Sequence, residues 1–593
     1  MNKWFVTAKK ADFNKIAEEF GISPVIARII RNRDVEGSEA VRKFLYGNRQ
    51  DLYSPMLLKD MDKGVEILKE AISNKKKIRI IGDYDVDGIC ATHILYTGIK
   101  ACGGNVDTII PDRIKDGYGL NNNLIEEAAG AGVELIVTCD NGIAALPQIA
   151  LAKSLGIDVV VTDHHEVMYA EKEDGREEII PPADAVIDPK QSGCTYPFKG
   201  ICGAVVAMKV IQALFICVNP QKEAQMLDMF LPFAALATVC DVMELLDENR
   251  IIVKEGLKLL RLRPCMGLLA LMQVNGLEPA GLNGYHLGFV IGPCINATGR
   301  LDTATRALEL LGTVDRNSAI NIASQLKELN DSRKTMTAKG VDNANSIIAH
   351  EGLAQNKVLV VYLPGCHESL AGIIAGRLRE VYCKPVFVLT DSENGVKGSG
   401  RSIDAYNMYE EMVKCKDCFS KFGGHKLAAG LSIDSELMKK IGGIEGLRDR
   451  LNASCNLEED DFVRKVHIDV PMPLSYADMD LAAQMELLEP FGVGNPKPLF
   501  AQKNVKFLTG KKIGANKNFA KYQVQDDEGN RFEVVFFGDL EVFHNFLTEK
   551  YGKKALDLYI KPQSNIYVSI TYQLGINSFR GNETVQMIMQ DYS

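Results

Sequence analysis

The chain has 593 residues, 46% of them hydrophobic, and a formal net charge of −9. The hydrophobic content is ordinary for globular proteins, and the length suggests about four domains at roughly 150 residues each. The N-terminal stretch MNKWFVTAKKADFNK lacks the apolar run of a signal peptide, and no apolar run approaches the ~18 residues of a membrane span. We therefore expect a cytoplasmic protein that does not contact membranes.

The first half of the chain predicts a small helical cap over about 50 residues, followed by an α/β domain. Between residues 77 and 190, short apolar strands alternate with helical stretches, which predicts a parallel sheet with right-handed crossovers. Continuous apolar runs of this kind are typical of strands buried on both faces. The predicted strands are KIRIIG (77–82), VDTII (106–110), ELIVTC (134–139), DVVVT (158–162) and ADAVID (183–188).

The second half predicts helices, another α/β segment and a β-rich end. Residues 223–262 and 301–349 have helical patterns, and the second of these suggests a connecting helix. A second α/β segment begins at KVLVVYL (357–363) and runs to about 455. From about residue 463, closely spaced strand patterns predict a small barrel. The acidic run 171–178 (EKEDGREE) is interpreted as a solvated loop.

Fourteen cysteines are scattered along the chain, many in apolar segments. This distribution favours reduced, buried thiols over a disulfide framework. Cys415 and Cys418 form one CxxC pattern, but no second pair of ligands lies nearby. Because a zinc site normally needs four ligands, we do not predict one there.

Three alternating carboxylates, Asp83, Asp85 and Asp87, follow the first predicted strand in the motif GDYDVDG. Ligands of open parallel sheets bind beyond the carboxyl ends of the strands. Acids this close repel one another unless cations neutralise them, and hard divalent cations prefer carboxylate oxygens. The alternatives are a solvated turn and a calcium loop. An EF-hand loop would need glutamate at its twelfth position, which is Ile94 here.

Two further strands also end in polar residues. Asp140 follows ELIVTC, and Asp163, His164 and His165 follow DVVVT. Asp241 ends another apolar run, in ATVCDVME. A lone histidine is usually structural, but two adjacent histidines beside other acidic strand ends indicate a metal site with carboxylate and imidazole ligands.

These motifs, in this order, resemble the DHH phosphoesterase superfamily. The stretches GYGLN (117–121), GPCINATGR (292–300), GRSIDAYN (400–407), FGGHKLAAG (422–430) and LLEPFGVGNPKPLF (487–500) resemble the RecJ exonucleases specifically, as does GISPVIARIIRNR in the cap. The resemblance covers nearly the whole chain. It implies an N-terminal cap (1–50), a DHH domain (51–300), a connecting helix (301–349), a DHH-associated domain (350–455) and an oligonucleotide-binding barrel (456–593).

The resemblance also implies roles for individual residues in catalysis. Two ions, Mn²⁺ or Mg²⁺, would be held by Asp83, Asp85, Asp87, Asp140, His164 and Asp241, with Asp140 as the bridge. His165 would touch the scissile phosphate. Asp163 would orient the neighbouring imidazoles, a support that metal-bound histidines commonly need.

Phosphates of the strand would be bound by residues from two later motifs and their surroundings. The implied contacts are Asn296, Arg300, Arg377, Arg401, Gly423, Gly424 and His425. The glycines fit this role because they let backbone amides approach phosphate closely. The chain departs from the family pattern at Ser369 and Leu370, where a glycine-containing run is expected, so the phosphate contacts near His367 are open.

The segment 511–522 interleaves lysines with Phe519 and Tyr522. Single strands are held by basic tracks and by stacking on aromatic rings, so this segment is a predicted strand-binding surface. The alternative is a solvated hairpin whose rings face the core, and we expect at least one of the two rings there.

The function implied is a single-strand-specific 5′→3′ exodeoxyribonuclease of DNA repair and recombination. It would release 5′-mononucleotides by two-metal catalysis and act as a monomer, with a helicase and a single-strand-binding protein as partners. Two alternatives stay open: a nano-RNase or cyclic-dinucleotide phosphodiesterase of the same superfamily, and a non-catalytic replication scaffold. The C-terminal barrel counts against the first alternative, and the complete set of Asp and His positions counts against the second. The acidic net charge counts mildly against nucleic-acid binding.

Overall fold

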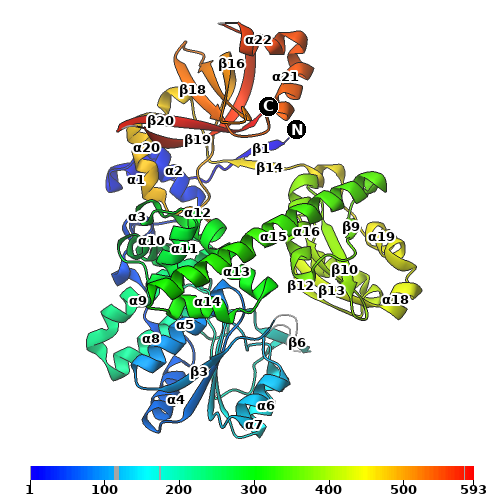
Figure 1. The fold of residues 1–593 in the computed structure, drawn as a ribbon. Coiled ribbons are helices and arrows are strands. Elements are labelled where there is room, and N and C mark those ends of the chain that lie inside the picture. Colours follow the sequence, from blue (N-terminus) through cyan, green and yellow to red (C-terminus); the bar gives the residue numbers. More distant parts are fainter. Residues whose placement is uncertain (1, 113–118, 173–174, 562, 580) are drawn as a thin grey trace. The chain divides into compact units, whose positions relative to one another are not determined.

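The structure is a computed structural model that describes residues 2–112, 119–172, 175–561, 563–579 and 581–593 (Figure 1). Its contacts divide it into two units. The larger unit consists of residues 2–265, 277–292 and 465–593, and the smaller of residues 266–276 and 293–464. Each unit has its own clusters of buried apolar side chains.

A five-stranded parallel sheet forms the centre of the first part of the larger unit. Its strand order is β3-β2-β4-β5-β8, and all four neighbouring pairs are parallel. The strands are β2 (Lys77–Ile81), β3 (Asn105–Ile109), β4 (Leu135–Cys139), β5 (Asp158–Thr162) and β8 (Ala185–Ile187). Each lies within two residues of its predicted position, and the predicted parallel sheet is confirmed.

Helices cover both faces of this sheet. They are α4 (Met61–Ser73), α5 (Val86–Ala101), α6 (Asn122–Gly130), α7 (Leu146–Ser154) and α8 (Gly203–Val218). Gly64 of α4 lies against Val160 of β5, whereas α6 and α7 share a cluster with Val159 and Val161. Successive residues of a strand point to opposite faces, so these two groups of helices lie on opposite sides.

The acidic run 171–178 is not the predicted loop. Residues 173–174 lie outside the described residues. The residues before and after them form the antiparallel hairpin of β6 (Met168–Lys172) and β7 (Gly175–Ile179). Charged side chains are tolerated there because a two-stranded hairpin leaves them exposed, as Glu171 and Arg176 are. The run EKEDGREE contains no apolar residues, so it lacks the apolar–polar alternation from which a strand is predicted.

Two helices follow α8, as predicted for residues 223–262: α9 (Glu223–Cys240) and α10 (Asp247–Leu262). Fully buried Lys209 of α8 pairs with Glu248 of α10 at 2.6 Å, and the Tyr196 hydroxyl donates to the same carboxylate. By length and composition, the described stretch Pro220–Cys240 could span a membrane, but 56% of its apolar 18-residue window is buried inside the protein. This burial is typical of a core helix.

The predicted N-terminal cap consists of α1 (Phe13–Phe20), α2 (Pro24–Asn32) and α3 (Ser38–Tyr46). An additional strand, β1 (Lys3–Val6), was not predicted and pairs in parallel with β14 (Lys465–Ile468). Buried Arg33 binds Asp469 at 2.5 Å, and residues of α2 and α3 share one apolar cluster with the C-terminal strands.

The C-terminal strands close into a five-stranded barrel, which confirms the predicted architecture. The order is β16-β17-β18-β20-β19, β19 pairs back to β16, and β15 extends the sheet beside β16. The elements are β15 (Val470–Pro471), β16 (Phe500–Ile513), β17 (Phe519–Gln525), β18 (Arg531–Phe536), α21 (Leu540–Tyr551), β19 (Ile566–Phe579) and β20 (Asn582–Tyr592).

The smaller unit combines helices with a second sheet. Its helices include α11 (Met266–Val274), α13 (Gly292–Leu301), α14 (Thr305–Gly312), α15 (Arg316–His350), α16 (Glu368–Tyr382) and α19 (Gly443–Ala453). The predicted connecting helix is thus two helices, of which α15 has 35 residues. The sheet has the order β12-β13-β11-β10-β9. Its strands are β9 (Leu359–Tyr362), β10 (Val386–Ser392), β11 (Gly395–Arg401), β12 (Lys421–His425) and β13 (Ala428–Asp434).

Candidate active site

The carboxyl ends of β2, β4 and β5 lie side by side at one edge of the parallel sheet. Asp83 and Asp85 follow β2, and Asp140 follows β4 with a positive φ of 58°. His164 and His165 follow β5. Because neighbouring parallel strands end at the same edge, residues far apart in the sequence meet there, as the spacing predicted.

Close backbone approach shapes the loop after β2. Asp85 caps α5, accepting hydrogen bonds from the amides of Asp87 at 2.9 Å and Gly88 at 3.0 Å. A Cβ on Gly88 would lie 2.5 Å from the Asp83 carbonyl oxygen. A side chain at position 88 would therefore open the loop that holds the three acids together.

Asp87 is fixed from another helix. Its two carboxylate oxygens accept hydrogen bonds from the amides of Gly203 at 2.6 Å and Ala204 at 2.7 Å, at the start of α8. A Cβ on Gly203 would lie 2.8 Å from Cβ of Asp140. The sequence analysis missed Gly203, because nothing near position 203 resembles a site motif.

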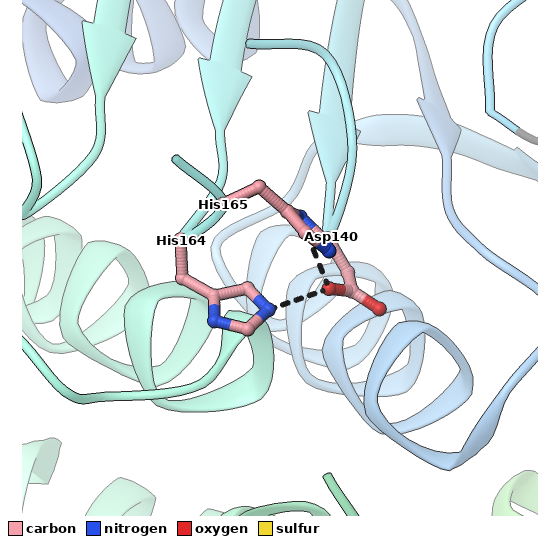
Figure 2. Close-up of side chains that lie close together, drawn as sticks. All are labelled: Asp140, His164 and His165. Carbon is pink, nitrogen blue, oxygen red and sulfur yellow. Dashed lines mark hydrogen bonds and ion pairs between the residues drawn. The ribbon is translucent and has the colours of Figure 1, made fainter. Parts of the chain in front are cut away.

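Three sets of side chains could each hold a metal ion, with their ligand atoms within 4.8 Å of one another. The sets are Asp83–Asp85–Asp140, Asp87–His164–Asp241 and Asp140–His164–His165. Figure 2 shows that both imidazoles lie close to Asp140, whose Oδ1 is 3.0 Å from Nε2 of His164 and 4.0 Å from Nδ1 of His165. All six predicted metal ligands are therefore gathered at one place.

The protonation equilibria of these groups fit a cation site. Burial and the charges of Asp87 and Asp85 raise the pKa of Asp140 well above its usual range, and raise the pKa of Asp241 to about 8. Burial lowers the pKa of His164, which favours the neutral imidazole that binds metals. Buried carboxylates that repel one another are stabilised by a divalent cation.

Asp163 occupies a different position from the other acids. Its Oδ2 accepts a hydrogen bond from the Ile143 amide at 2.9 Å, and its Oδ1 accepts one from the His164 amide at 2.7 Å. Oδ1 is also 2.7 Å from Nδ1 of His165. Burial opposes the charged imidazolium, but this bond and the Asp163 charge raise the pKa of His165 to about 9.

Asp188 is a further acidic strand end that the sequence analysis did not single out. It follows β8, is fully buried, and accepts a hydrogen bond from the Lys190 amide at 2.7 Å. Burial raises its pKa to about 8, and the charge of Asp163 adds to the shift. The signal was available, since ADAVID is a predicted strand that ends in aspartate.

The predicted phosphate-binding residues lie in the smaller unit. Arg300, at the end of α13, donates from Nη1 to the Ser369 carbonyl at 2.7 Å, and the Ser369 hydroxyl donates to the Arg300 carbonyl at 3.3 Å. His367 caps α16 and lies 2.7 Å from the same hydroxyl. Ser369, the departure from the family pattern, thus joins α13 to α16. Asn296 is half-buried on α13.

The remaining predicted contacts lie on the second sheet and its helix. Arg377 is exposed on α16 and pairs with Glu380, while Arg401 ends β11 and lies over Gly372 of α16. Gly423, Gly424 and His425 are exposed and lie in β12, which pairs with β13. Of the GYGLN motif, residues 117 and 118 lie outside the described residues.

The predicted strand-binding segment lies on the barrel and lines a cavity of about 760 Å³. Lys512, Lys517 and half-buried Phe519 line it, together with Phe537, whose ring is 5.1 Å from that of Phe519. Tyr522 instead belongs to the core, fully buried, with its hydroxyl 2.8 Å from that of Tyr559. One ring of the segment therefore faces the core, as expected.

Models of three protein families match the chain. Residues 77–238 match the N-terminal domain of the DHH family, residues 355–452 the DHHA1 domain, and residues 468–591 the RecJ OB domain. The DHH match contains the strand-end acids and histidines described above, except Asp241. The OB match contains the barrel and its cavity.

Curated relatives match along nearly the whole chain. The single-stranded-DNA-specific exonuclease RecJ of Bacillus subtilis (strain 168) is 34% identical over 99% of this chain and 70% of its own length. The protein of the same name from Haemophilus influenzae is 31% identical over 96% of each chain. The crystal structure of RecJ from Thermus thermophilus in complex with Mn²⁺ covers all of this chain and 79% of its own, with a TM-score of 0.79 and 25% identity.

Proposed function

This chain belongs to the RecJ family, and we propose from this that it is a metal-dependent exonuclease that degrades single-stranded DNA. The observation that carries the proposal is the convergence of Asp83, Asp87, Asp140, His164 and their neighbours at one sheet edge. The match of residues 468–591 to an OB domain supports a nucleic-acid strand as the substrate.

Two ions, Mn²⁺ or Mg²⁺, would be held by these ligand sets, and Asp140, 3.0 Å from Nε2 of His164, is the proposed shared ligand. Asp83 and Asp85 would complete one site, and Asp87, His164 and Asp241 the other. When bound, such ions supply a nucleophilic hydroxide at neutral pH and stabilise charge on the phosphate oxygens. The amides of Gly203 and Ala204 hold the Asp87 carboxylate in place for this role.

His165 is the proposed contact to the scissile phosphate. Asp163 holds the imidazole through Nδ1, so the proposed phosphate contact uses Nε2. The raised pKa of His165 favours a positive charge, and a positive charge near a phosphodiester stabilises the charge that develops during its hydrolysis. Asp163 therefore acts as a positioning residue.

The smaller unit would bind phosphates further along the strand. The proposed contacts are Asn296, Arg300, Arg377, Arg401, Gly423, Gly424 and His425. A guanidinium carries five N–H donors, so Arg300 can bind the Ser369 carbonyl and a phosphate at the same time. The proposed domains are those of the family: 1–50, 51–300, 301–349, 350–455 and 456–593.

Further proposals concern polarity and setting. We propose that digestion runs 5′→3′ and releases 5′-mononucleotides, and that the enzyme is a cytoplasmic monomer acting in DNA repair and recombination. A helicase and a single-strand-binding protein are its proposed partners. These assignments rest on the family pattern of motifs.

The proposal is tested by digestion of one oligonucleotide sequence as single-stranded DNA, duplex DNA and RNA, labelled at either end. With Mn²⁺, single-stranded DNA should be degraded fastest, and the 5′ label should be released first, as a mononucleotide. EDTA should stop the reaction. Asp140→Ala should lower kcat more than tenfold, which corresponds to a loss above ~1.4 kcal/mol, whereas Asp158→Ala at the opposite sheet edge should not.

Three results would contradict the proposal. Full activity in EDTA would exclude metal catalysis. Hydrolysis confined to dinucleotides or trinucleotides would indicate the nano-RNase or cyclic-dinucleotide alternative. Strand binding without any hydrolysis would indicate a scaffold.

A further inference from the structure

Two large aromatic side chains, Tyr285 and Phe289, stack on each other in the larger unit and stay in solvent. They are 63% and 68% exposed, their ring centroids are 5.0 Å apart, and their planes differ by 22°. Tyr285 lies in the helical turn α12 (Gly284–His286), and Phe289 lies in the π-helical segment Leu287–Ile291. Rings of this size are usually buried, and π-helical turns are frequent at functional sites.

The segment that carries these rings is fixed at both ends. At its start, Nε of Arg261 donates to the Leu282 carbonyl at 2.8 Å, and the Asn283 side chain accepts a hydrogen bond from the His286 amide. At its end, a Cβ on Gly292 would lie 2.3 Å from Sγ of Cys240. The two rings are therefore presented on a rigid support, as a binding surface requires.

The same contacts place the segment that carries the rings against the end of α9, next to a proposed metal ligand. Sγ of Cys240 lies 3.5 Å from the Leu287 carbonyl, two residues before Phe289. Cys240 is the last residue of α9, and Asp241, a proposed metal ligand, caps that helix. Val242 follows with 65% exposure and a positive φ of 60°, a strained conformation for a β-branched residue. The segment that carries the rings therefore packs against Cys240, the residue that precedes Asp241.

We propose that Tyr285 and Phe289 form a stacking platform for an unpaired nucleobase close to the scissile phosphate. This inference rests on the proposed function. Every base has a π-face, so stacking binds bases of any sequence. A base inside a duplex is already stacked and paired, so the platform favours single-stranded over duplex DNA next to the metal centre.

The test is a binding measurement on the full chain, with Ca²⁺ replacing Mn²⁺ to prevent hydrolysis. The variant Tyr285→Leu/Phe289→Leu keeps apolar side chains but removes both rings. Two single-stranded oligonucleotides are compared, one normal and one with three abasic nucleotides at each end. The variant should bind the normal strand about tenfold more weakly than the wild type does and the abasic strand equally well.

Two controls separate stacking from a structural effect. Tyr46→Leu removes a ring that is 45% exposed in the N-terminal helices of the same unit and should leave both affinities unchanged. Tyr285→Phe keeps the ring and should restore the affinity that Tyr285→Leu loses. If the variant also binds the abasic strand more weakly than the wild type does, the proposal is overturned. The effects of removing the rings and of removing the bases would then be independent of each other.

Equal binding of the normal strand by variant and wild type would also overturn the platform and leave the ring pair to another occupant, such as an apolar protein segment. Hydrolysis by the wild type is measured separately with Mn²⁺. Absence of hydrolysis would contradict the proposed function. The binding comparison alone tests whether Tyr285 and Phe289 form a stacking platform.

Discussion

Single residues show why the site needs cations. Asp85, Asp140 and Asp241 have raised pKa values, with burial as the first cause and the charges of neighbouring aspartates as the second. Gathering such groups destabilises the fold as long as their charges are not compensated. The clustered carboxylates that the proposed metal site requires therefore lower the stability of the fold at this edge of the sheet. A bound metal ion offsets this loss by compensating their charges.

We predict that Mn²⁺ stabilises the wild type and that Asp140→Asn removes most of this effect. A ligand present at 100 times its Kd contributes about 2.7 kcal/mol. In EDTA the variant should be at least as stable as the wild type, because it lacks a buried, repelled carboxylate. Tm with and without Mn²⁺ measures both effects, and Asp158→Asn is the control. An unchanged Mn²⁺-dependent shift in the Asp140 variant would refute its role as a shared ligand.

His93 gives a second prediction at this scale. It is buried in α5 with its ring 4.5 Å from that of Phe233, and burial lowers its pKa to about 4. Below pH 6.5 the unfolded chain binds a proton that the folded chain excludes until about pH 4. Stability should therefore fall by ~1.4 kcal/mol per pH unit in this window. Unfolding of wild type and His93→Leu is compared between about pH 6.5 and 5; parallel profiles would contradict the prediction.

At the scale of elements, the barrel places a cavity at the β16–β17 turn whose lining combines basic and aromatic side chains with the acidic Asp539 and Glu541. Lys512 and Lys517 line it beside Phe519 and Phe537, and the helix α21 begins at its wall. Basic tracks act through counterion release, and aromatic rings act through stacking. The two contributions can therefore be measured separately.

We predict that Lys512→Ala and Lys517→Ala weaken binding of single strands and lower its salt dependence. The slope of log K against log salt should fall by about 0.7 for each phosphate that a lysine no longer neutralises. Phe519→Ala should weaken binding by ~1–3 kcal/mol without changing the slope. Lys561→Ala, whose lysine pairs with Asp557, is the control. Binding of a single-stranded oligonucleotide is titrated at two salt concentrations for each variant. An unchanged slope in both lysine variants would exclude the cavity as a strand-binding site.

At the scale of the larger unit, the N-terminal helices and the barrel share one core. Arg250 of α10 donates to the carbonyls of Leu487 and Leu488, both at 2.8 Å, and Arg33 pairs with Asp469. Apolar residues of α2, α3 and the barrel strands form one cluster. The barrel is therefore part of the fold as well as the proposed strand-binding surface.

We predict that deletion of residues 463–593 leaves a chain that does not fold stably. The deletion removes the partners of buried Arg33 and Arg250. Breaking one buried ion pair alone costs ~3–5 kcal/mol. The truncated chain should bind a dye for exposed apolar surface and show no cooperative thermal transition. A truncated protein with the wild-type Tm would show instead that the shared cluster contributes little.

Sequence patterns located the sheet and the acids because both depend on short-range rules. A buried parallel strand needs a continuous apolar run, so β2, β4 and β5 were visible, and Asp83, Asp140 and His164 follow directly from their ends. β1 was missed because a four-residue, largely exposed strand has no pattern until β14 pairs with it. The hairpin β6–β7 was missed because its charged residues face solvent.

By itself, the sequence determined the fold class, the order of the domains and the position of the six predicted metal ligands along the chain. The fold class follows from local periodicity and the acids from motifs at strand ends, whereas the domain order and the ligand set were implied by the resemblance to the RecJ exonucleases. Tertiary structure alone decided that Gly203 fixes Asp87, that Asp188 joins the buried acids, and that the segment carrying Tyr285 and Phe289 packs against Cys240, the neighbour of Asp241. Each of these depends on packing between segments far apart in the chain, and a local pattern carries no information about which distant backbone will pack against it.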